Sequence, residues 1–235
     1  MEFIESLFKL KDHKTSFKKE VLAGLATFLT MAYIMVVNPA ILSETGMDFD
    51  SVFVATILAS FVACMLMGIL ANWPVALAPG MGLNAFFTYA VVFGMGFTWQ
   101  QALAAVFCSG ILFLIISISP LRAYLINAIP RSLKFGIGAG IGLFLAIIGL
   151  KNAGIVVDNP ATLVGLGDLK SAPVLLALLT FTLMIALDKL KIPGAIVISI
   201  LATTVLGFIF GVAQFQGFAS SIPSMSPTFM QLDFS

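Results

Sequence analysis

Long apolar stretches alternate with short polar ones along the whole chain. Seven of them come close to the roughly 20 residues that a transmembrane helix needs. They are residues 19–38, 51–70, 75–97, 100–119, 133–150, 173–187 and 193–213. The pattern predicts an all-α polytopic membrane protein with seven transmembrane segments.

Composition strengthens this interpretation and excludes a soluble protein. The 235 residues are 60% hydrophobic and only 10% charged, whereas a soluble domain has roughly 25% charged residues. No Asp, Glu, Lys, Arg or His occurs between Asp50 and Arg122, a stretch long enough for three crossings. The first apolar stretch lacks a small-residue cleavage site, so we expect it to be an uncleaved span.

The basic residues predict the orientation. Ten of the twelve fall on one side of the predicted membrane, and only Lys151 and Lys170 fall on the other. The ten are Lys9, Lys11, Lys14, Lys18, Lys19, Arg122, Arg131, Lys134, Lys189 and Lys191. Because basic residues concentrate on the cytoplasmic side, we expect a multi-pass protein of the plasma (inner) membrane with a cytoplasmic N-terminus and an extracytoplasmic C-terminus.

The third stretch cannot be one continuous helix. Pro79 removes a helical hydrogen bond, and Gly80 and Gly82 weaken the remainder. We expect a short strand at residues 75–78, followed by a half-helix that begins at Pro79 or Gly80. Five extended residues advance about 16 Å, half of a hydrocarbon core about 30 Å thick, so the half-helix should begin near the bilayer midplane.

Such a helix start suits a ligand. Its free N–H groups carry the positive end of the helix dipole, and glycines let a ligand approach the backbone. Asn84 adds an amide that both donates and accepts, and Phe86 or Phe87 could stack on a planar ring. The alternative is that Pro79 only kinks a packed helix and Asn84 makes an interhelical hydrogen bond.

Two long motifs carry a resemblance to a known family. They are Ala78-Pro79-Gly80-Met81-Gly82-Leu83-Asn84-Ala85-Phe86-Phe87 and Gly24-Leu25-Ala26-Thr27-Phe28-Leu29-Thr30-Met31-Ala32-Tyr33-Ile34, the second followed by Val37-Asn38-Pro39. The sequence resembles the AzgA-like guanine/hypoxanthine/adenine permeases of the nucleobase:cation symporter-2 (xanthine/uracil permease) family, over nearly its whole length.

The resemblance implies a fold of fourteen segments in two inverted repeats of seven, of which this chain would be the first. Residues 1–18 would then form a cytoplasmic N-terminal segment. Residues 19–119 would hold spans one to four of a core domain, and residues 120–213 would hold spans five to seven of a gate domain. Residues 214–235 would be an extracytoplasmic connection toward a second repeat.

The resemblance also implies the site. Substrate would lie between the broken third and tenth segments, and the matching positions here are Gly80, Met81, Gly82, Leu83, Asn84, Ala85 and Phe86. Thr27 and Thr30 of the first span are weaker candidates. Hydrogen bonding between helices is an equally good explanation for these two threonines.

The implied activity is proton symport of purine nucleobases such as guanine, hypoxanthine or adenine, without enzyme chemistry or a cofactor. Expected partners are the purine, the lipid bilayer, the second repeat and, as an alternative to a monomer, a second copy of the chain, with no nucleic acid. The family's acidic coupling residues lie beyond Ser235, and the sequence offers no second strand for residues 75–78, so we expect the chain alone to be inactive. The alternatives are an anion transporter of the same fold and a non-transporting membrane subunit.

Overall fold

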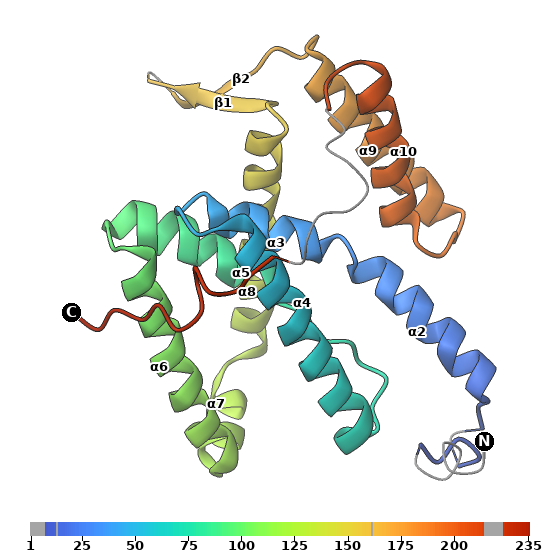
Figure 1. Cartoon of the computed structure of the whole chain (residues 1–235), viewed down its shortest axis with the longest axis vertical. Coiled ribbons are helices and arrows are strands. Elements are labelled where there is room, and N and C mark those ends of the chain that lie inside the picture. The colour runs from blue at the N-terminus through green and yellow to red at the C-terminus, as the bar shows by residue number, and fades with distance from the viewer. Residues whose placement is uncertain (1–7, 13, 161, 214–222) are drawn as a thin grey trace.

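The computed structural model describes residues 8–12, 14–160, 162–213 and 223–235. The described chain is mainly helical (Figure 1). The helices are α2 (Phe17–Met31), α3 (Ile34–Ser43), α4 (Phe49–Leu66), the π-helical turn η1 (Met67–Ala71), α5 (Met81–Ala85), the π-helical η2 (Phe86–Gly94), α6 (Trp99–Ile118), α7 (Leu121–Ala128), α8 (Arg131–Asn152), α9 (Ala172–Lys189) and α10 (Ala195–Ile209). Parts of the expected N-terminal segment and C-terminal connection, residues 1–7 and 214–222, lie outside this description.

Five helical segments are long and apolar enough to cross a membrane, judged by length and composition. They are Phe17–Ser43, Phe49–Ala71, Trp99–Ile118, Arg131–Asn152 and Ala172–Lys189. Two shorter apolar helices, Met81–Gly94 and Ala195–Ile209, coincide with the third and seventh predicted stretches. A mainly helical membrane chain is therefore confirmed, while seven complete crossings stay a prediction.

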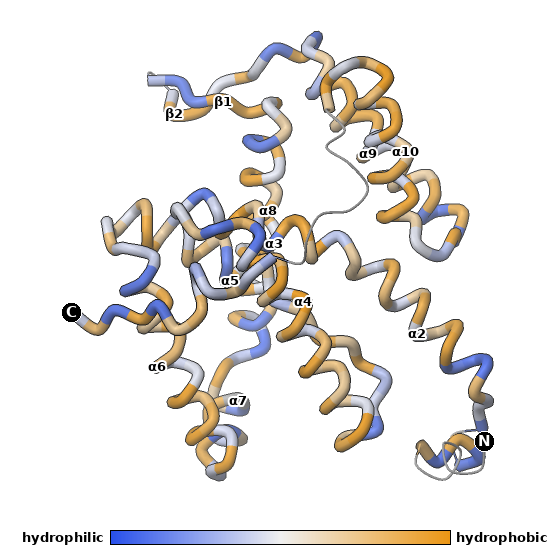
Figure 2. The backbone as a smooth tube through the Cα atoms, in the orientation of Figure 1, coloured by the Kyte–Doolittle hydropathy of each residue, from blue (hydrophilic) through white to orange (hydrophobic). Residues whose placement is uncertain are grey.

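The apolar side chains are mostly on the outside. The chain exposes 16581 Å², whereas a soluble monomer of 25.0 kDa would expose about 10,000 Å². Figure 2 shows hydrophobic residues along most of α2, α4 and α6, with hydrophilic residues mainly at the connections. A surface of this kind is suited to lipid and to further protein.

A small buried cluster joins the ends of several elements. Met47 and Val52, before and within α4, pack with Phe87 of η2 and Ala102 of α6, and Trp99 packs against them. Thr98 and Gln101 form a capping box that starts α6 at this cluster. The cluster thereby fixes the half-helix that follows the break against the second and fourth apolar stretches.

The C-terminal residues 223–235 return to the same end of the molecule. The hydroxyl oxygen of Ser51, in the first turn of α4, lies 2.8 Å from the Ser224 carbonyl oxygen. The Gln101 side chain, in the first turn of α6, donates to the Ser235 carbonyl oxygen at 3.3 Å. The tail therefore lies across the starts of α4 and α6 (Figure 1).

The end predicted for the first span was wrong. Pro39 lies inside α3 rather than after it, and this helix continues to Ser43. Ala32 and Tyr33 instead separate α2 from α3. A proline is tolerated inside a membrane helix where neighbouring helices satisfy the freed groups, and Pro39 is buried where α3 packs against α4.

The chain is also not entirely helical. An antiparallel hairpin of β1 (Val156–Asn159) and β2 (Leu163–Leu166) connects α8 to α9. The pattern of long apolar stretches does not predict these strands, because four residues are far shorter than a transmembrane span. Gly154 has φ +75° at the end of α8 and turns the chain toward the hairpin.

Candidate functional site

The predicted interruption of the third stretch is confirmed. Helix η1 ends at Ala71, the following Asn72 adopts a left-handed conformation with φ 47°, and residues 72–80 are neither helix nor strand. Helix α5 begins at Met81 after Gly80, whose φ of −81° and ψ of 110° are extended. α5 and η2 together form the half-helix, a continuous helical segment from Met81 to Gly94.

The strand expected at residues 75–78 does not form. A β-strand is stabilised by a neighbouring strand, and the described residues offer none here. The Cys64 thiol of α4 takes that position instead. Its Sγ accepts from the Leu77 N–H at 3.1 Å and donates to the Leu77 carbonyl oxygen at 3.2 Å. A side chain thus pairs both backbone groups of one residue in the extended segment.

The start of the half-helix carries free donors. The N–H groups of Leu83 and Asn84 donate to the Gly80 carbonyl oxygen at 3.1 and 3.3 Å. Met81 and Gly82 precede them, and helix geometry leaves the N–H groups of these first positions without intrahelical acceptors. The positive end of the helix dipole coincides with these donors.

The two glycines at this start differ in their surroundings. A Cβ atom at Gly80 would meet nothing within 4 Å, whereas one at Gly82 would lie 2.8 Å from Ile141 Cγ2 of α8. Gly80 is exposed, and Gly82 is half-buried. Space for a ligand beside the backbone therefore exists at Gly80, while α8 covers Gly82.

A polar network begins one turn further on. The Asn84 side-chain amide donates to Asn38 Oδ1 of α3. Asn38 Nδ2 donates to the Thr56 hydroxyl of α4 at 2.7 Å, and that hydroxyl donates to the Val52 carbonyl oxygen at 2.7 Å. The network joins the half-helix to the first two apolar stretches. Asn84 therefore does make an interhelical hydrogen bond, and it also keeps an accessible part.

The other predicted positions of this segment divide into exposed and packed residues. Leu83 is 76% exposed and Phe86 50% exposed, whereas Ala85 is fully buried. Met81 is half-buried. Phe87 is packed in the cluster with Met47, so of the two aromatic rings considered for stacking, only Phe86 is accessible.

Thr27 and Thr30 do not join this group in the structure. Both are exposed residues of α2. The Thr27 hydroxyl donates to the Ala23 carbonyl oxygen at 2.9 Å, and the Thr30 hydroxyl donates to the Thr27 carbonyl oxygen at 2.7 Å. These are bonds within their own helix, which leave a contact with substrate as a prediction only.

Sequence reasoning missed Asn38 and Thr56 as parts of the site. Each is only 3% exposed. Asn38 belongs to the Val37-Asn38-Pro39 motif, and the sequence pattern predicts it only as the last residue of the first span. A polar amide within an apolar stretch was the available signal, because such a group must find a hydrogen-bond partner in a membrane protein.

A second polar contact lies farther along the half-helix. The Tyr89 hydroxyl donates to Glu44 Oε1 at 2.9 Å, linking η2 to the residue that follows α3. The Asn152 side chain at the end of α8 lies near this hydroxyl. The ends of α3 and α8 therefore lie beside η2 at Tyr89.

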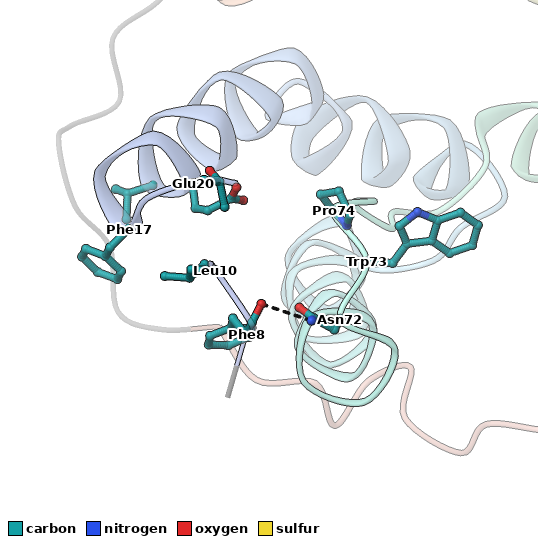
Figure 3. Close-up of a pocket in the computed structure, with 10 residues that line it drawn as sticks. Phe8, Leu10, Phe17, Glu20, Asn72, Trp73 and Pro74 are labelled. Atoms are coloured by element: carbon teal, nitrogen blue, oxygen red, sulfur yellow. Dashed lines mark hydrogen bonds between the residues drawn. The ribbon is translucent and has the colours of Figure 1, made fainter. Parts of the chain in front are cut away.

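A hollow of about 400 Å³ lies elsewhere, between the N-terminal residues, α2 and the end of η1 (Figure 3). Its walls are mainly apolar, with the Glu20 carboxylate among them, and Asn72 Nδ2 donates to the Phe8 carbonyl oxygen at 3.2 Å beside it. None of the predicted site residues lines it. Residues 80–86 are the better candidate site, because the Asn84 side-chain network lies there and not at this hollow.

An apolar polytopic chain with a broken helix and a polar network at the break has the features of a membrane transport protein, not of an enzyme. The sequence profile of the Permease family matches residues 18–234, and the chain belongs to this family.

Relatives of known name are similar over most of the chain. It is 48% identical to the guanine/hypoxanthine permease PbuO of Bacillus subtilis over 93% of its length, and 47% identical to the adenine permease AdeP of Escherichia coli over 94%. It is 44% identical to the guanine/hypoxanthine permease PbuG of Bacillus subtilis over 97%. These matches cover 51%, 50% and 54% of the relatives, so the chain spans about half their length.

Proposed function

We propose that the chain is the first repeat of a purine nucleobase permease, which binds its substrate at the start of the broken third segment. The observation that carries the proposal is the Asn84 amide, held in a polar network at the positive end of the half-helix. The names of the relatives, which include adenine and guanine/hypoxanthine permeases, support purines as the substrates.

The site suits a neutral planar heterocycle. A nucleobase edge carries N–H and C=O or ring-nitrogen groups, which the Asn84 amide and the N–H groups of Met81 and Gly82 can match. Phe86 offers an accessible ring for stacking. A bound anion would be stabilised by a cationic side chain at this place. The third stretch offers none, because no Lys or Arg occurs between Asp50 and Arg122.

We further propose the topology expected from the lysines, with the N-terminus in the cytoplasm. Contacts between distant segments agree with it. Ser51 meets Ser224 at the proposed extracytoplasmic end, and Asn72 meets Phe8 at the proposed cytoplasmic end. Each contact joins two segments that the seven-span topology assigns to the same side.

Residues 19–119 would act as the core domain and residues 120–213 as the gate domain. The contact between Gly82 and Ile141 would then lie on the boundary between them. Alternating access would proceed by movement of one domain against the other around the site at Gly80–Phe86. The coupling ion in this proposal is a proton, and its acidic acceptors would belong to a second repeat.

The test is uptake of radiolabelled hypoxanthine, guanine and adenine by liposomes with an imposed proton gradient. The chain would be assayed alone and fused to the part of AdeP that it does not cover. We expect concentrative uptake by the fusion only, with loss in Asn84→Ala at an unchanged circular dichroism spectrum. Uptake by the 235 residues alone would contradict the half-permease assignment.

Competition separates the alternatives. Excess unlabelled purine should abolish uptake by the fusion, and inorganic anions should not. Inhibition by sulfate or chloride would favour the anion transporter of the same fold. Absence of both purine binding and uptake in a folded fusion would favour a non-transporting membrane subunit.

A further inference from the structure

The donor and the acceptor of each hydrogen bond in the network of Asn84, Asn38 and Thr56 can be assigned by starting from the Val52 carbonyl oxygen. The Thr56 hydroxyl lies 2.7 Å from the Val52 carbonyl oxygen. A carbonyl oxygen only accepts, so the single hydroxyl proton of Thr56 points to Val52. Thr56 Oγ1 can then only accept a further hydrogen bond, through its lone pairs. Whatever approaches that oxygen from Asn38 must therefore be a donor.

The same reasoning sets both asparagine amides. The group of Asn38 at 2.7 Å from Thr56 is its NH₂, so its Oδ1 faces the half-helix. The group of Asn84 that meets this oxygen is likewise an NH₂. Rotating either amide by half a turn would place oxygen against oxygen or NH₂ against NH₂. The Val52 carbonyl thus determines the orientation of Asn84 through two intermediate side chains.

Burial makes this orientation firm. Asn38 and Thr56 are each 3% exposed, so water has little access to replace a lost partner. Asn84 is only half-buried, and its Oδ1 accepts no hydrogen bond from the described residues. Within the described chain, the fully buried side-chain polar atom without a hydrogen-bond partner is Ser117 Oγ. Asn84 Oδ1 also lacks a partner among the described residues, so it is not fully buried.

We propose that Asn38 and Thr56 are positioning residues, which hold Asn84 with its carbonyl oxygen presented to the ligand as an acceptor. The site then selects a ligand edge that offers an N–H donor to Asn84, while the N–H groups of Met81 and Gly82 take an acceptor of the same ligand. The identity of the ligand as a purine rests on the proposed function, but the direction of the network does not.

The network itself can be tested without any ligand. In the chain with ¹⁵N-labelled asparagine, held in detergent micelles, Thr56→Val removes the hydroxyl at nearly constant shape and Thr56→Ser keeps it. We expect Thr56→Val to shift the side-chain amide signals of both Asn38 and Asn84 and to speed their exchange with water about five-fold. Thr56→Ser should leave them in place. Unchanged Asn84 signals in Thr56→Val would overturn the proposal.

The ligand role requires a comparison of analogues in the AdeP fusion. Hypoxanthine would compete with its 1-, 7- and 9-methyl derivatives, each of which replaces one possible N–H donor. In the unaltered protein and in Thr56→Ser, one of these derivatives should bind about ten-fold or more weakly than hypoxanthine. The quantity compared is this ratio of the two affinities. In Thr56→Val the amide can rotate, so this ratio should approach one.

The ratio distinguishes positioning from a merely structural role. A loss of stability would weaken all the ligands alike and leave the ratio unchanged, and that result in Thr56→Val would overturn the positioning role. If the unaltered fusion neither binds nor transports any purine, the proposed function and the ligand role fail together. The amide signals still decide whether Thr56 orients Asn84.

Discussion

Gly82 at the start of the half-helix lies against Ile141 of α8, so closely that a Cβ atom would come within 2.8 Å of Ile141 Cγ2. A real side-chain atom does not approach a neighbour so closely, and Ile141 is β-branched and has little freedom to rotate away. The absence of a side chain at Gly82 is therefore what allows α5 and α8 to meet.

We predict that Gly82→Ala lowers the free energy of unfolding by about 1 kcal/mol. Overpacking costs about 1–3 kcal/mol, and the better helix propensity of alanine offsets about 1 kcal/mol of this. Gly142→Ala in α8 is the matched control, because nothing lies within 4 Å of its Cβ position. Unfolding by sodium dodecyl sulfate in mixed micelles measures both. Recovery in Gly82→Ala/Ile141→Ala would assign the cost to this contact, and equal stability of the two single variants would contradict it.

The contact of Cys64 with Leu77 makes a prediction about the extended segment. Cys64→Ala leaves the Leu77 N–H and carbonyl oxygen without the partner that they have in the structure. We expect hydrogen exchange at the Leu77 amide to accelerate about five-fold or more, since one net hydrogen bond is lost. Cys108→Ala, at an exposed thiol of α6, is the control. Exchange that is the same in both variants would mean that the thiol does not order this segment.

Local chemistry explains what the sequence could predict. Pro79 removes a helical hydrogen bond and Gly80 and Gly82 beside it weaken the helix further, so the break and the start of the half-helix could be placed from a few neighbouring residues. The long apolar stretches likewise predicted the helices α4, α6, α8 and α9 to within a few residues. Each of these inferences depends on residues that are close together in the chain.

Features that depend on tertiary contacts were missed. Asn38 and Asn84 are 46 positions apart, and only the packing of α3 against α5 brings their amides together. The same packing keeps Pro39 inside a helix, where local rules predicted an end. Which of Phe86 and Phe87 faces outward depends on the cluster around Met47, which no local pattern describes.

The bond from Tyr89 to Glu44 should contribute modestly to stability. Tyr89→Phe removes it at nearly constant shape, and we expect a loss of about 1 kcal/mol in the free energy of unfolding, because the carboxylate is exposed to solvent. Tyr124→Phe, at a residue of α7 that is 71% exposed, should change nothing measurable. The double variant Tyr89→Phe/Glu44→Gln tests the pair. If Glu44→Gln lowers the stability of Tyr89→Phe as much as it lowers that of the unaltered chain, the two groups do not interact.

Asp48 predicts a dependence of stability on acid. It caps α4, and hydrogen bonds from the Ser51 hydroxyl and then from the Ser51 backbone N–H lower its pKa below the ordinary value of 3.8. Because the pKa is lower in the folded chain than in the unfolded one, the stabilisation is fully present above 3.8 and disappears as the pH falls through the folded value.

Thermal unfolding followed by circular dichroism from neutral pH to below 3.8 measures this effect. Asp48→Asn keeps a side-chain oxygen that can cap the helix but has no proton to gain, so the acid-dependent fall in the melting temperature should be smaller in this variant. Asp233, whose pKa is lowered by hydrogen bonds from Ser235, should contribute with the same sign, and Asp233→Asn removes that share separately. An unchanged acid dependence in Asp48→Asn would show that the bonds to Ser51 do not stabilise the charged carboxylate.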